Sequence, residues 1–228
     1  MFVRKLVLIF SSITSGLFIP SQAQEPAQTE TLEELVVVAN RIPQPIRQIG
    51  TSVSVLTEDM LQAHGNFSLA NILRQSPAIA VTRNGGMGAT SALRIRGEEG
   101  FRTLTLLDGL KISDPSAPQV FTPFEHILSS GVSRVEILRG PQGLSYGADA
   151  GGVISINSKP TDPGVSVILD GQSGSRSTEL GNLHLAAAND SIDFSLSATE
   201  FETGGYNVRA SDTVLADNDG YENSTVHA

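Results

Sequence analysis

The chain is 228 residues long, contains no cysteine and carries a formal net charge of −9. This acidic balance argues against non-specific nucleic-acid binding, which depends on lysine and arginine contacts to phosphates, so we expect no nucleic-acid partner. Without cysteine the chain has no disulfides, and its four histidines are too few to favour a structural zinc site.

The first 23 residues have the pattern of a secretory signal peptide. Arg4 and Lys5 precede an apolar run over residues 6–19, and small residues lead to Ala23, where a signal peptidase would cut. The alternative is a membrane anchor. Serine and threonine interrupt the run, however, and it is shorter than the roughly 20 residues that span a bilayer. We therefore expect residues 1–23 to be removed on export.

Residues 24–41 are a polar, acidic segment that contains one short apolar run. Residues 24–34 show no hydrophobic periodicity and predict a flexible tether. The run that follows is either the first buried strand of the next domain or a peptide that adds as a strand to the sheet edge of a partner protein. It consists of Leu35, Val36, Val37, Val38 and Ala39.

Short strands and two short helices are predicted between residues 42 and 131. Thr57 is a suitable N-cap for a helix over residues 58–64 that ends at Gly65, and a second helix is expected over residues 69–75. Asp108-Gly109 between two apolar runs predicts a tight hairpin. Strands are expected at residues 51–56, 79–82, 92–96, 103–107 and 110–113.

Residues 132–159 read VSRVEILRGPQGLSYGADAGGVISINSK. Their β-branched residues predict strands at 134–138 and 153–157, joined by a glycine-rich loop. Residues 143–147 in that loop satisfy the Gly-x-Ser-x-Gly pattern of serine hydrolases. That pattern requires a helix after the serine, and here a second strand follows, so we do not expect an enzyme.

Beyond residue 161 apolar and polar residues alternate. Ile192, Phe194, Leu196 and Ala198 alternate with polar residues, and residues 165–172 and 183–188 are rich in apolar residues. Alternation over about ten residues between turns is typical of transmembrane β-barrel strands, although soluble antiparallel sheets show it too. We expect three strands, with a tight turn at residues 189–191 and a long polar loop over residues 202–228.

The stretch from Ser133 to Lys159 resembles the end of the plug domain of TonB-dependent outer-membrane receptors, where RVE, LRGP, YG and GG recur in this order. The segments LRIRG (93–97) and LLDGLKI (106–112) resemble the same family in order and spacing, and ELVVVANR (34–41) resembles a TonB box. The resemblance implies a tether with a TonB box at residues 24–41 and an α+β plug domain at 42–160. It also implies the start of an antiparallel transmembrane β-barrel at 161–228.

The function that the resemblance implies is energy-coupled uptake of a nutrient across the outer membrane, gated by the plug and without catalysis. The implied partners are TonB, outer-membrane lipid and a small metal chelate. TonB would pair with Leu35, Val36, Val37, Val38 and Ala39, the substrate would meet Arg83, Asn84, Met87, Ser113, Pro115 and Gln119, and the barrel wall would meet Arg94, Arg96, Arg139 and Tyr146.

Cobalamin is the first substrate we expect, and an iron siderophore is the alternative. Residues 204–221 resemble the second extracellular loop of cobalamin receptors, in which acidic residues bind calcium. This implies calcium at Asp212, Asp217 and Asp219, although Asn207 stands where those receptors carry an aspartate. An acidic, solvated loop is the alternative interpretation, and no other cofactor is expected.

The number of strands bears on how such a chain would work. A receptor barrel of this kind has about 22 strands. An open sheet of three would leave backbone groups unsatisfied in lipid. We therefore expect either the N-terminal part of a longer receptor or a non-functional truncated receptor. A periplasmic binding or signalling module that uses a plug without a barrel is the remaining alternative.

Overall fold

The computed structural model describes residues 35–36, 42–65, 67–117, 119–140, 146, 151–159, 161–209, 211 and 217–228. Internal contacts divide the chain into residues 1–32 and 33–228, and all described residues belong to the second unit. No helix within the described ranges is long and apolar enough to cross a membrane.

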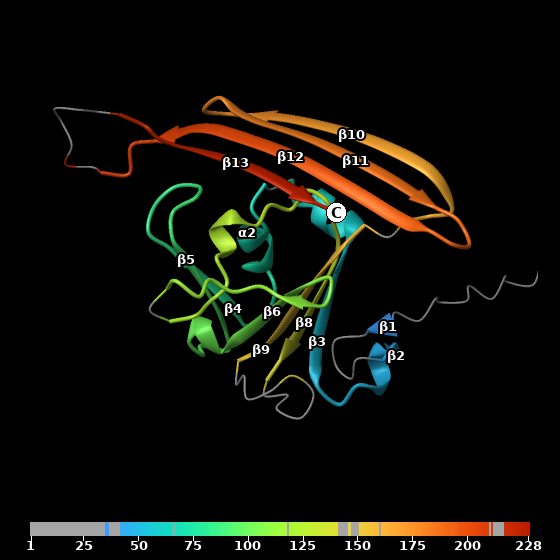
Figure 1. Ribbon diagram of the computed structural model, residues 1–228. Helices are drawn as coiled ribbons and strands as arrows, with labels where there is room; N and C mark the ends of the chain where they lie inside the picture. The colour runs from blue at the N-terminus through green and yellow to red at the C-terminus, as the bar shows by residue number, and fades with distance from the viewer. Residues whose placement is uncertain are drawn as a thin grey trace, which may run out of the picture. The chain divides into compact units, whose positions relative to one another are not determined.

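The domain expected as the plug, which keeps that name below, is built on a five-stranded sheet with the strand order β3-β8-β9-β6-β7 (Figure 1). Neighbouring strands are antiparallel except β6 and β9, which run parallel. All five strands were expected, with ends that shift by at most two residues. Their bounds are β3 Ser52–Thr57, β6 Thr103–Leu107, β7 Leu110–Lys111, β8 Val132–Arg139 and β9 Gly152–Ser158.

Two small antiparallel sheets accompany the central sheet. Strands β4 (Ile79–Arg83) and β5 (Ser91–Ile95) form a hairpin at the expected position. Strand β1 (Leu35–Val36) pairs with β2 (Gln44–Pro45), which was not expected. Both strands of this second pair are two residues long.

Both expected helices are present and short. Helix α1 (Glu58–Ala63) begins after Thr57, whose side chain makes no capping hydrogen bond, and Gly65 follows its end with φ of 53°. Helix α2 (Leu69–Leu73) has four buried residues and packs into the main core together with Ile137 and Ile154 of the central sheet. Single 3-10 turns occur at η1 (Ile46–Gln48), η2 (Gly100–Arg102) and η3 (Phe124–His126).

The turn between β6 and β7 forms as the sequence predicts. Asp108 and Gly109 both have positive φ, 47° and 82°, and Leu107 pairs with Leu110. Two successive positive φ angles are typical of the type I′ turn, whose twist matches that of the adjoining strands. The Asp108 carboxylate also accepts a hydrogen bond from the Ser158 N–H at 2.8 Å, which ties the turn to the end of β9.

The C-terminal sheet is a four-stranded antiparallel meander. The three expected strands are present, but the expected long polar loop over residues 202–228 was wrong because a fourth strand lies within it. Strand β12 extends to Tyr206, and residues 219–227, expected in that loop, form a fourth strand that pairs with it. The inward residues of β13 are polar or aromatic, which hid the usual apolar alternation. The strands are β10 Gly164–Gly174, β11 Thr178–Ala188, β12 Asp193–Tyr206 and β13 Asp219–His227.

The two faces of the C-terminal sheet differ in character. The face toward the plug buries Leu180 and Phe201 among polar side chains such as Asn182 and His184. The opposite face leaves large apolar residues uncovered, and Leu169 is 76% exposed. Alternate residues of a strand point to opposite faces, so the alternation in the sequence becomes one mixed inner face and one apolar outer face. The most exposed of these outer residues are Val165, Val167, Leu169, Phe194 and Val226.

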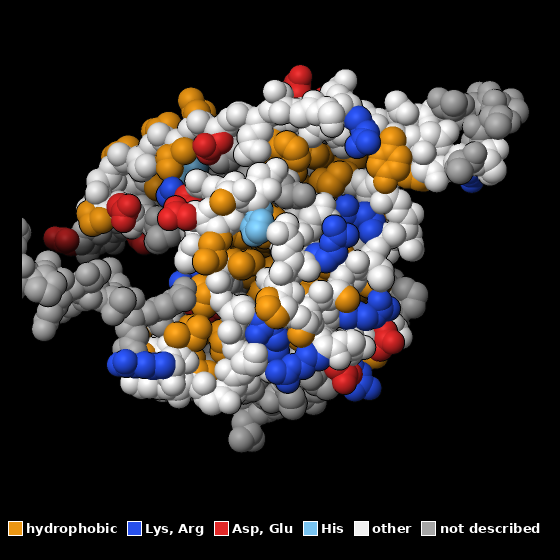
Figure 2. Space-filling view, turned by 180° about the vertical axis from the view of Figure 1, so that it is seen from behind, with side chains coloured by type: hydrophobic (Ala, Val, Ile, Leu, Met, Phe, Trp, Pro, Cys, Tyr) orange, Lys and Arg blue, Asp and Glu red, His pale blue; other side chains and the backbone are white. Residues whose placement is uncertain are grey.

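Charge is also divided unevenly between the two regions. Residues 42–160 contain ten Lys and Arg against nine Asp and Glu, whereas residues 161–228 contain two against eleven. Most of the Lys and Arg side chains visible in Figure 2 accordingly lie over the plug, below the sheet. The net negative charge of the folded part therefore comes from the C-terminal sheet and its loops.

Candidate functional site

The N-terminal strand β1 contains the first two of the five residues expected to bind TonB. Val36 is fully buried against Leu104, Leu138 and Val153, on the face of the central sheet opposite α2. Leu35 is exposed, and its backbone carbonyl accepts a hydrogen bond from the side chain of Arg134. The remaining three, Val37, Val38 and Ala39, lie outside the described residues. TonB binding by this segment stays a prediction.

The loop between β4 and β5 carries three of the residues expected to meet the substrate. Arg83, at the end of β4, donates to Ser68 Oγ at 3.1 Å, and the backbone N–H of Asn84 donates to the Thr90 carbonyl at 3.1 Å. Met87 packs toward the C-terminal sheet, in a cluster with Leu128 and Phe201. The structure therefore places this loop where the plug meets the sheet.

The second loop expected to meet the substrate is closed on itself. Asp114 pairs with Phe121 in an isolated bridge, and its carboxylate accepts hydrogen bonds from the Ser116 N–H at 2.8 Å and the Ser116 hydroxyl at 2.6 Å. These bonds hold the pKa of Asp114 below its usual value. Ser113, Pro115 and Gln119 lie on this loop, so the substrate residues expected from the sequence belong to two differently anchored loops.

Arg139 was expected to contact the barrel wall, but its guanidinium is committed inside the plug. Nε donates to the Pro77 carbonyl at 2.9 Å, Nη1 donates to Ser52 Oγ at 2.8 Å, and Nη2 donates to Ser54 Oγ. Burial lowers the pKa of Arg139, and the positive charge of Arg96 lowers it further. Arginine nevertheless remains a cation at any physiological pH. Its role in this structure is to join β3 and β8 to the segment that follows α2.

The other residues expected at the barrel wall also make their described contacts within the plug. Arg94 donates to Thr82 Oγ1 at 3.3 Å and lies 3.7 Å from the Glu99 carboxylate. Arg96 has a positive φ of 54°, and Tyr146 packs against the core cluster that contains Val36. The described side-chain contacts of Arg94, Arg139 and Tyr146 thus lie within the plug, and any contact of the four residues with further wall strands stays a prediction.

A different set of plug residues contacts the C-terminal sheet. His126 Nδ1 lies 2.9 Å from the Tyr221 hydroxyl, and the two rings stack with centroids 5.9 Å apart. Asn223 completes the cluster by donating to the Tyr221 hydroxyl at 2.8 Å and to the His126 carbonyl at 3.4 Å. The turn η3 and the strand β13 are thus joined by hydrogen bonds and by ring stacking, across 95 residues of sequence.

Apolar packing reinforces this joint. Phe67 lies 5.3 Å from Phe201, measured between ring centroids, and Phe201 lies 6.0 Å from Tyr221. Gly88 has φ of 74°, and a Cβ added there would lie 2.0 Å from Tyr221 Cδ2, far inside van der Waals contact. Glycine is therefore required at this position both by the backbone conformation and by the close approach of the tyrosine ring.

Two polar contacts extend the joint along the sheet. Ser130 Oγ donates to Thr199 Oγ1 at 3.3 Å, and His227 Nε2 lies 2.7 Å from Asp108 Oδ2. Asp108 is the turn residue described above, so one carboxylate links β7, β9 and β13. None of these contacts was expected from the sequence, and the polar or aromatic residues at every second position of β13 were the one signal of an inner face in contact with the plug.

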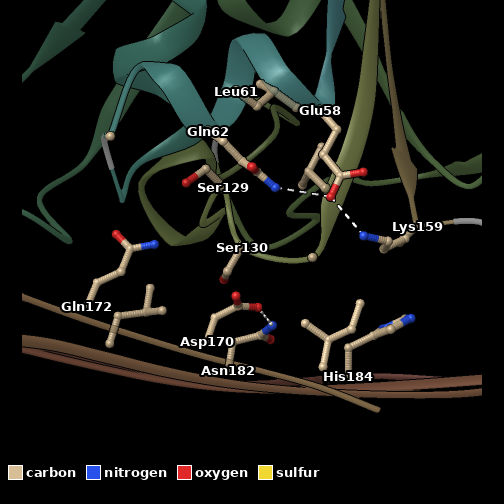
Figure 3. A pocket seen from close by; sticks show the side chains of 15 residues that line it. Glu58, Leu61, Gln62, Ser129, Ser130, Lys159, Asp170, Gln172, Asn182 and His184 are labelled. Carbon is tan, nitrogen blue, oxygen red and sulfur yellow. Dashed lines mark hydrogen bonds and ion pairs between the residues drawn. The ribbon is translucent and has the colours of Figure 1, made fainter. Parts of the chain in front are cut away.

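A cavity of about 370 Å³ lies between α1 of the plug and strands β10 and β11 (Figure 3). Its polar walls are internally paired: Glu58 bonds Lys159 at 2.9 Å, and Asn182 donates to Asp170 at 3.3 Å. His184 faces the same space, with Nδ1 2.7 Å from Ser197 Oγ. These groups make the space hydrophilic and suited to water, and they do not converge on a common point.

The acidic loop before β13 was expected to bind calcium. Asp219 accepts a hydrogen bond from the Val208 N–H at 2.9 Å, which closes the loop, and Asp217 is exposed. Asp212 lies outside the described residues. Among the residues that are described, no three histidine or acidic side chains are placed to hold a metal ion. Calcium binding therefore stays a prediction.

Comparison with known proteins agrees with this arrangement. Residues 45–154 match the family model described as the TonB-dependent Receptor Plug Domain. A curated relative is the vitamin B12 transporter BtuB of Vibrio vulnificus (strain CMCP6), which is 29% identical over 217 residues, or 94% of this chain. The chain spans only 35% of that relative's length.

Solved structures share the fold. The alcaligin outer-membrane receptor FauA from Bordetella pertussis superposes on 75% of this chain with a TM-score of 0.62 and 21% identity, and the match covers 29% of that protein. The ferripyoverdine receptor of the outer membrane of Pseudomonas aeruginosa covers 75% of this chain with a TM-score of 0.60 and 17% identity, over 23% of its own length.

Proposed function

Because residues 45–154 are a plug domain of the TonB-dependent receptor family, we propose that this chain takes part in energy-coupled import of a nutrient across a bacterial outer membrane. The observation that carries the proposal is the continuity of the match. Similarity to a vitamin B12 transporter extends over 217 residues, beyond the plug and into the C-terminal sheet. The outward apolar face of that sheet supports a location in outer-membrane lipid.

Cobalamin is the substrate we propose first, because the curated relative transports vitamin B12. A ferric siderophore is the second candidate, favoured by the solved receptors for ferripyoverdine and alcaligin that share the fold. In either case the loop around Arg83, Asn84 and Met87 is proposed to report substrate binding. Met87 packs on the sheet through the same cluster as Phe201, so a ligand that moves this loop would disturb the plug–sheet joint.

The energy-coupling partner is proposed to be TonB, acting on the N-terminal strand. An extended peptide that adds to a sheet edge gains main-chain hydrogen bonds. Leu35 is half exposed at such an edge, while Val36 anchors the strand in the plug. A pull on this strand would thus act directly on the cluster of Leu104, Leu138 and Val153 beneath it.

Asp212, Asp217 and Asp219 are proposed as calcium ligands in an external loop.

The proposal is tested with a chimera in which this chain, joined after Ala228, replaces the aligned N-terminal part of the Vibrio vulnificus vitamin B12 transporter. In a bacterium without its own vitamin B12 transporter, the chimera is expected to import labelled cyanocobalamin when TonB is present and not when TonB is deleted. The matched variant is Leu35→Pro, which removes an N–H from the half-exposed residue of the N-terminal strand and should abolish uptake while leaving surface amounts unchanged.

Growth on ferric siderophores as the sole iron source distinguishes the second candidate. A chimera that supports this growth and imports no cyanocobalamin would assign the plug to siderophores. A chimera that reaches the cell surface and imports neither compound would contradict the proposed function.

A further inference from the structure

Strand β1 has one edge paired with β2 and one edge turned away from it. Leu35 lies opposite Pro45, and Val36 lies opposite Gln44. Opposed residues in an antiparallel pair alternate between pairs that exchange two hydrogen bonds and pairs that exchange none. Proline has no N–H, so Leu35 and Pro45 are the pair that exchanges none. The carbonyl of Leu35 therefore points toward the free edge of β1.

The side chain of Arg134 donates a hydrogen bond to that carbonyl. Arg134 Nη2 donates to the Leu35 oxygen at 2.5 Å, and Arg134 Nε donates to Glu136 Oε1 at 2.8 Å. Arg134 and Glu136 are two residues apart on β8 and so share a face of the strand. The Glu136 side chain is only 3% exposed, whereas that of Arg134 is 28% exposed. A buried carboxylate thus fixes the direction of a guanidinium that reaches the surface.

We propose that Arg134 controls access to the free edge of β1, a role called the guard below. It fastens the strand to the plug and covers the main-chain acceptor that an incoming peptide strand would use. This inference rests on the proposed function for the identity of the partner, an extended segment of TonB. It adds a control on when that partner can bind, because the guanidinium on the Leu35 oxygen takes up the space through which a partner strand would approach this edge of β1.

The chemistry of the bond favours a guard over a loose contact. A hydrogen bond from a cation is stronger than one between neutral groups, so a neutral peptide N–H does not readily displace Arg134. Glu136 keeps its own bond to the guanidinium, and the arginine can therefore swing from Leu35 without losing its charge partner. Leaving the carbonyl exposes β1, while Val36 still holds the strand on the core.

The guard also lies on the strand that begins at the plug–sheet joint. Gly131 approaches Ser197, and Ser130 bonds Thr199. Strand β8 starts at Val132 and brings Arg134 four residues beyond Ser130. A shift of the plug against the sheet would therefore move the guard directly, without a longer chain of contacts.

The first test measures binding of the full chain, in detergent, to a purified periplasmic domain of TonB. Arg134→Gln removes the cation and is expected to tighten binding roughly tenfold. Arg134→Lys keeps the charge but lacks the two-sided fork that reaches both Glu136 and Leu35, and should tighten it less. The matched control is Arg102→Gln, whose guanidinium makes an exposed ion pair with Glu98 and lies 5.7 Å from the centroid of the Phe101 ring. Unchanged or weaker binding by Arg134→Gln overturns the guard.

The second test needs no partner and uses the absence of cysteine from the chain. Val36→Cys places a thiol at a fully buried position, so its reaction with a maleimide reports release of β1. Adding Arg134→Gln is expected to accelerate this reaction roughly tenfold. Ile137→Cys, in the main core on the opposite side of the central sheet, should stay protected in both backgrounds. A Val36→Cys rate that does not respond to Arg134→Gln also overturns the guard.

The two readouts separate this inference from the proposed function. If Arg134→Gln releases Val36→Cys but no variant binds the TonB domain, the proposed partner is wrong and the guard on β1 stands. If the unmodified chain binds and Arg134→Gln alters neither readout, the guard is wrong and the proposed function stands. If Arg134→Gln also exposes Ile137→Cys, the plug has unfolded, and Glu136→Gln then decides: it should release β1 in the same direction, and no change overturns the guard.

Discussion

The plug buries most of the large apolar side chains of its strands and helices, whereas the C-terminal sheet turns many of its own outward. Ile137 and Ile154 of the plug are fully buried, while Val165 and Leu169 of the sheet are more than three-quarters exposed. The inner face of the sheet is instead filled with polar groups such as Asn182, which bonds Thr199 at 2.9 Å. The plug is thus stabilised like any water-soluble domain, and the sheet has the opposite polarity, as strands between a polar interior and lipid do.

The largest expected effect concerns the plug core. Ile154→Ala removes a fully buried side chain from the centre of the plug and should lower the free energy of unfolding by about 3 kcal/mol, through lost burial and the cavity that remains. Val167→Ala, on the exposed face of the sheet, is the control and should change it by less than about 0.5 kcal/mol. Denaturant titration of the full chain in detergent measures both. Equal effects would contradict the opposite polarity of the two regions.

A second comparison tests the contacts that Arg139 makes inside the plug. Arg139→Gln should destabilise the plug by about 2 kcal/mol, because the Pro77 carbonyl and two serine hydroxyls lose a buried donor. Arg94, whose side chain is 33% exposed and pairs with the exposed Glu99, is its matched control, and Arg94→Gln should cost less than about 0.5 kcal/mol. The denaturation midpoints of both variants measure this difference. A neutral Arg139→Gln would return the residue to the role of a wall contact.

The joint between plug and sheet is tested at Gly88. Gly88→Ala adds a Cβ that overlaps the Tyr221 ring and should cost roughly 1–3 kcal/mol. Gly97 has a similar positive φ of 81° but open space around it, so Gly97→Ala carries the backbone strain without the overlap. The difference between the two midpoints isolates the contact with β13. No difference would mean that the Gly88 loop does not rest on the sheet.

The smallest effect concerns the loop around Asp114. Because its pKa is lowered in the folded state, Asp114 contributes stability above its unfolded value of 3.8 and loses this contribution as the pH falls further. Asp114→Asn should speed hydrogen exchange of the Ser116 amide near neutral pH. At low pH the exchange rates of the variant and the unmodified chain should be the same. The other loops of the plug should exchange as before. If the exchange rate at Ser116 responds neither to Asp114→Asn nor to low pH, the carboxylate does not order this loop.

Local patterns predicted most of the secondary structure correctly. Asp108-Gly109 forms its tight turn because two adjacent residues suffice to set positive φ angles. Helix α1 lies where its N-cap and its C-terminal glycine predict it. Strand β13 was missed because its inner residues face the plug and do not alternate in hydrophobicity with the outer ones. They are Tyr221, Asn223, Thr225 and His227. Alternation of apolar and polar residues predicts a strand that packs on apolar neighbours, but it does not predict one that packs on polar neighbours.

The order of the elements, the plug motifs and the change from plug to alternating strands could be predicted from the sequence, since each rests on residues close together in the chain. The directions of the arginine side chains and the residues that join the two regions became visible in the fold alone. Arg139 turns inward because Ser52 and Pro77 offer acceptors there, and His126 meets Tyr221 because the plug and β13 share a surface. Such contacts join residues 62 to 95 positions apart, and no local spacing encodes them.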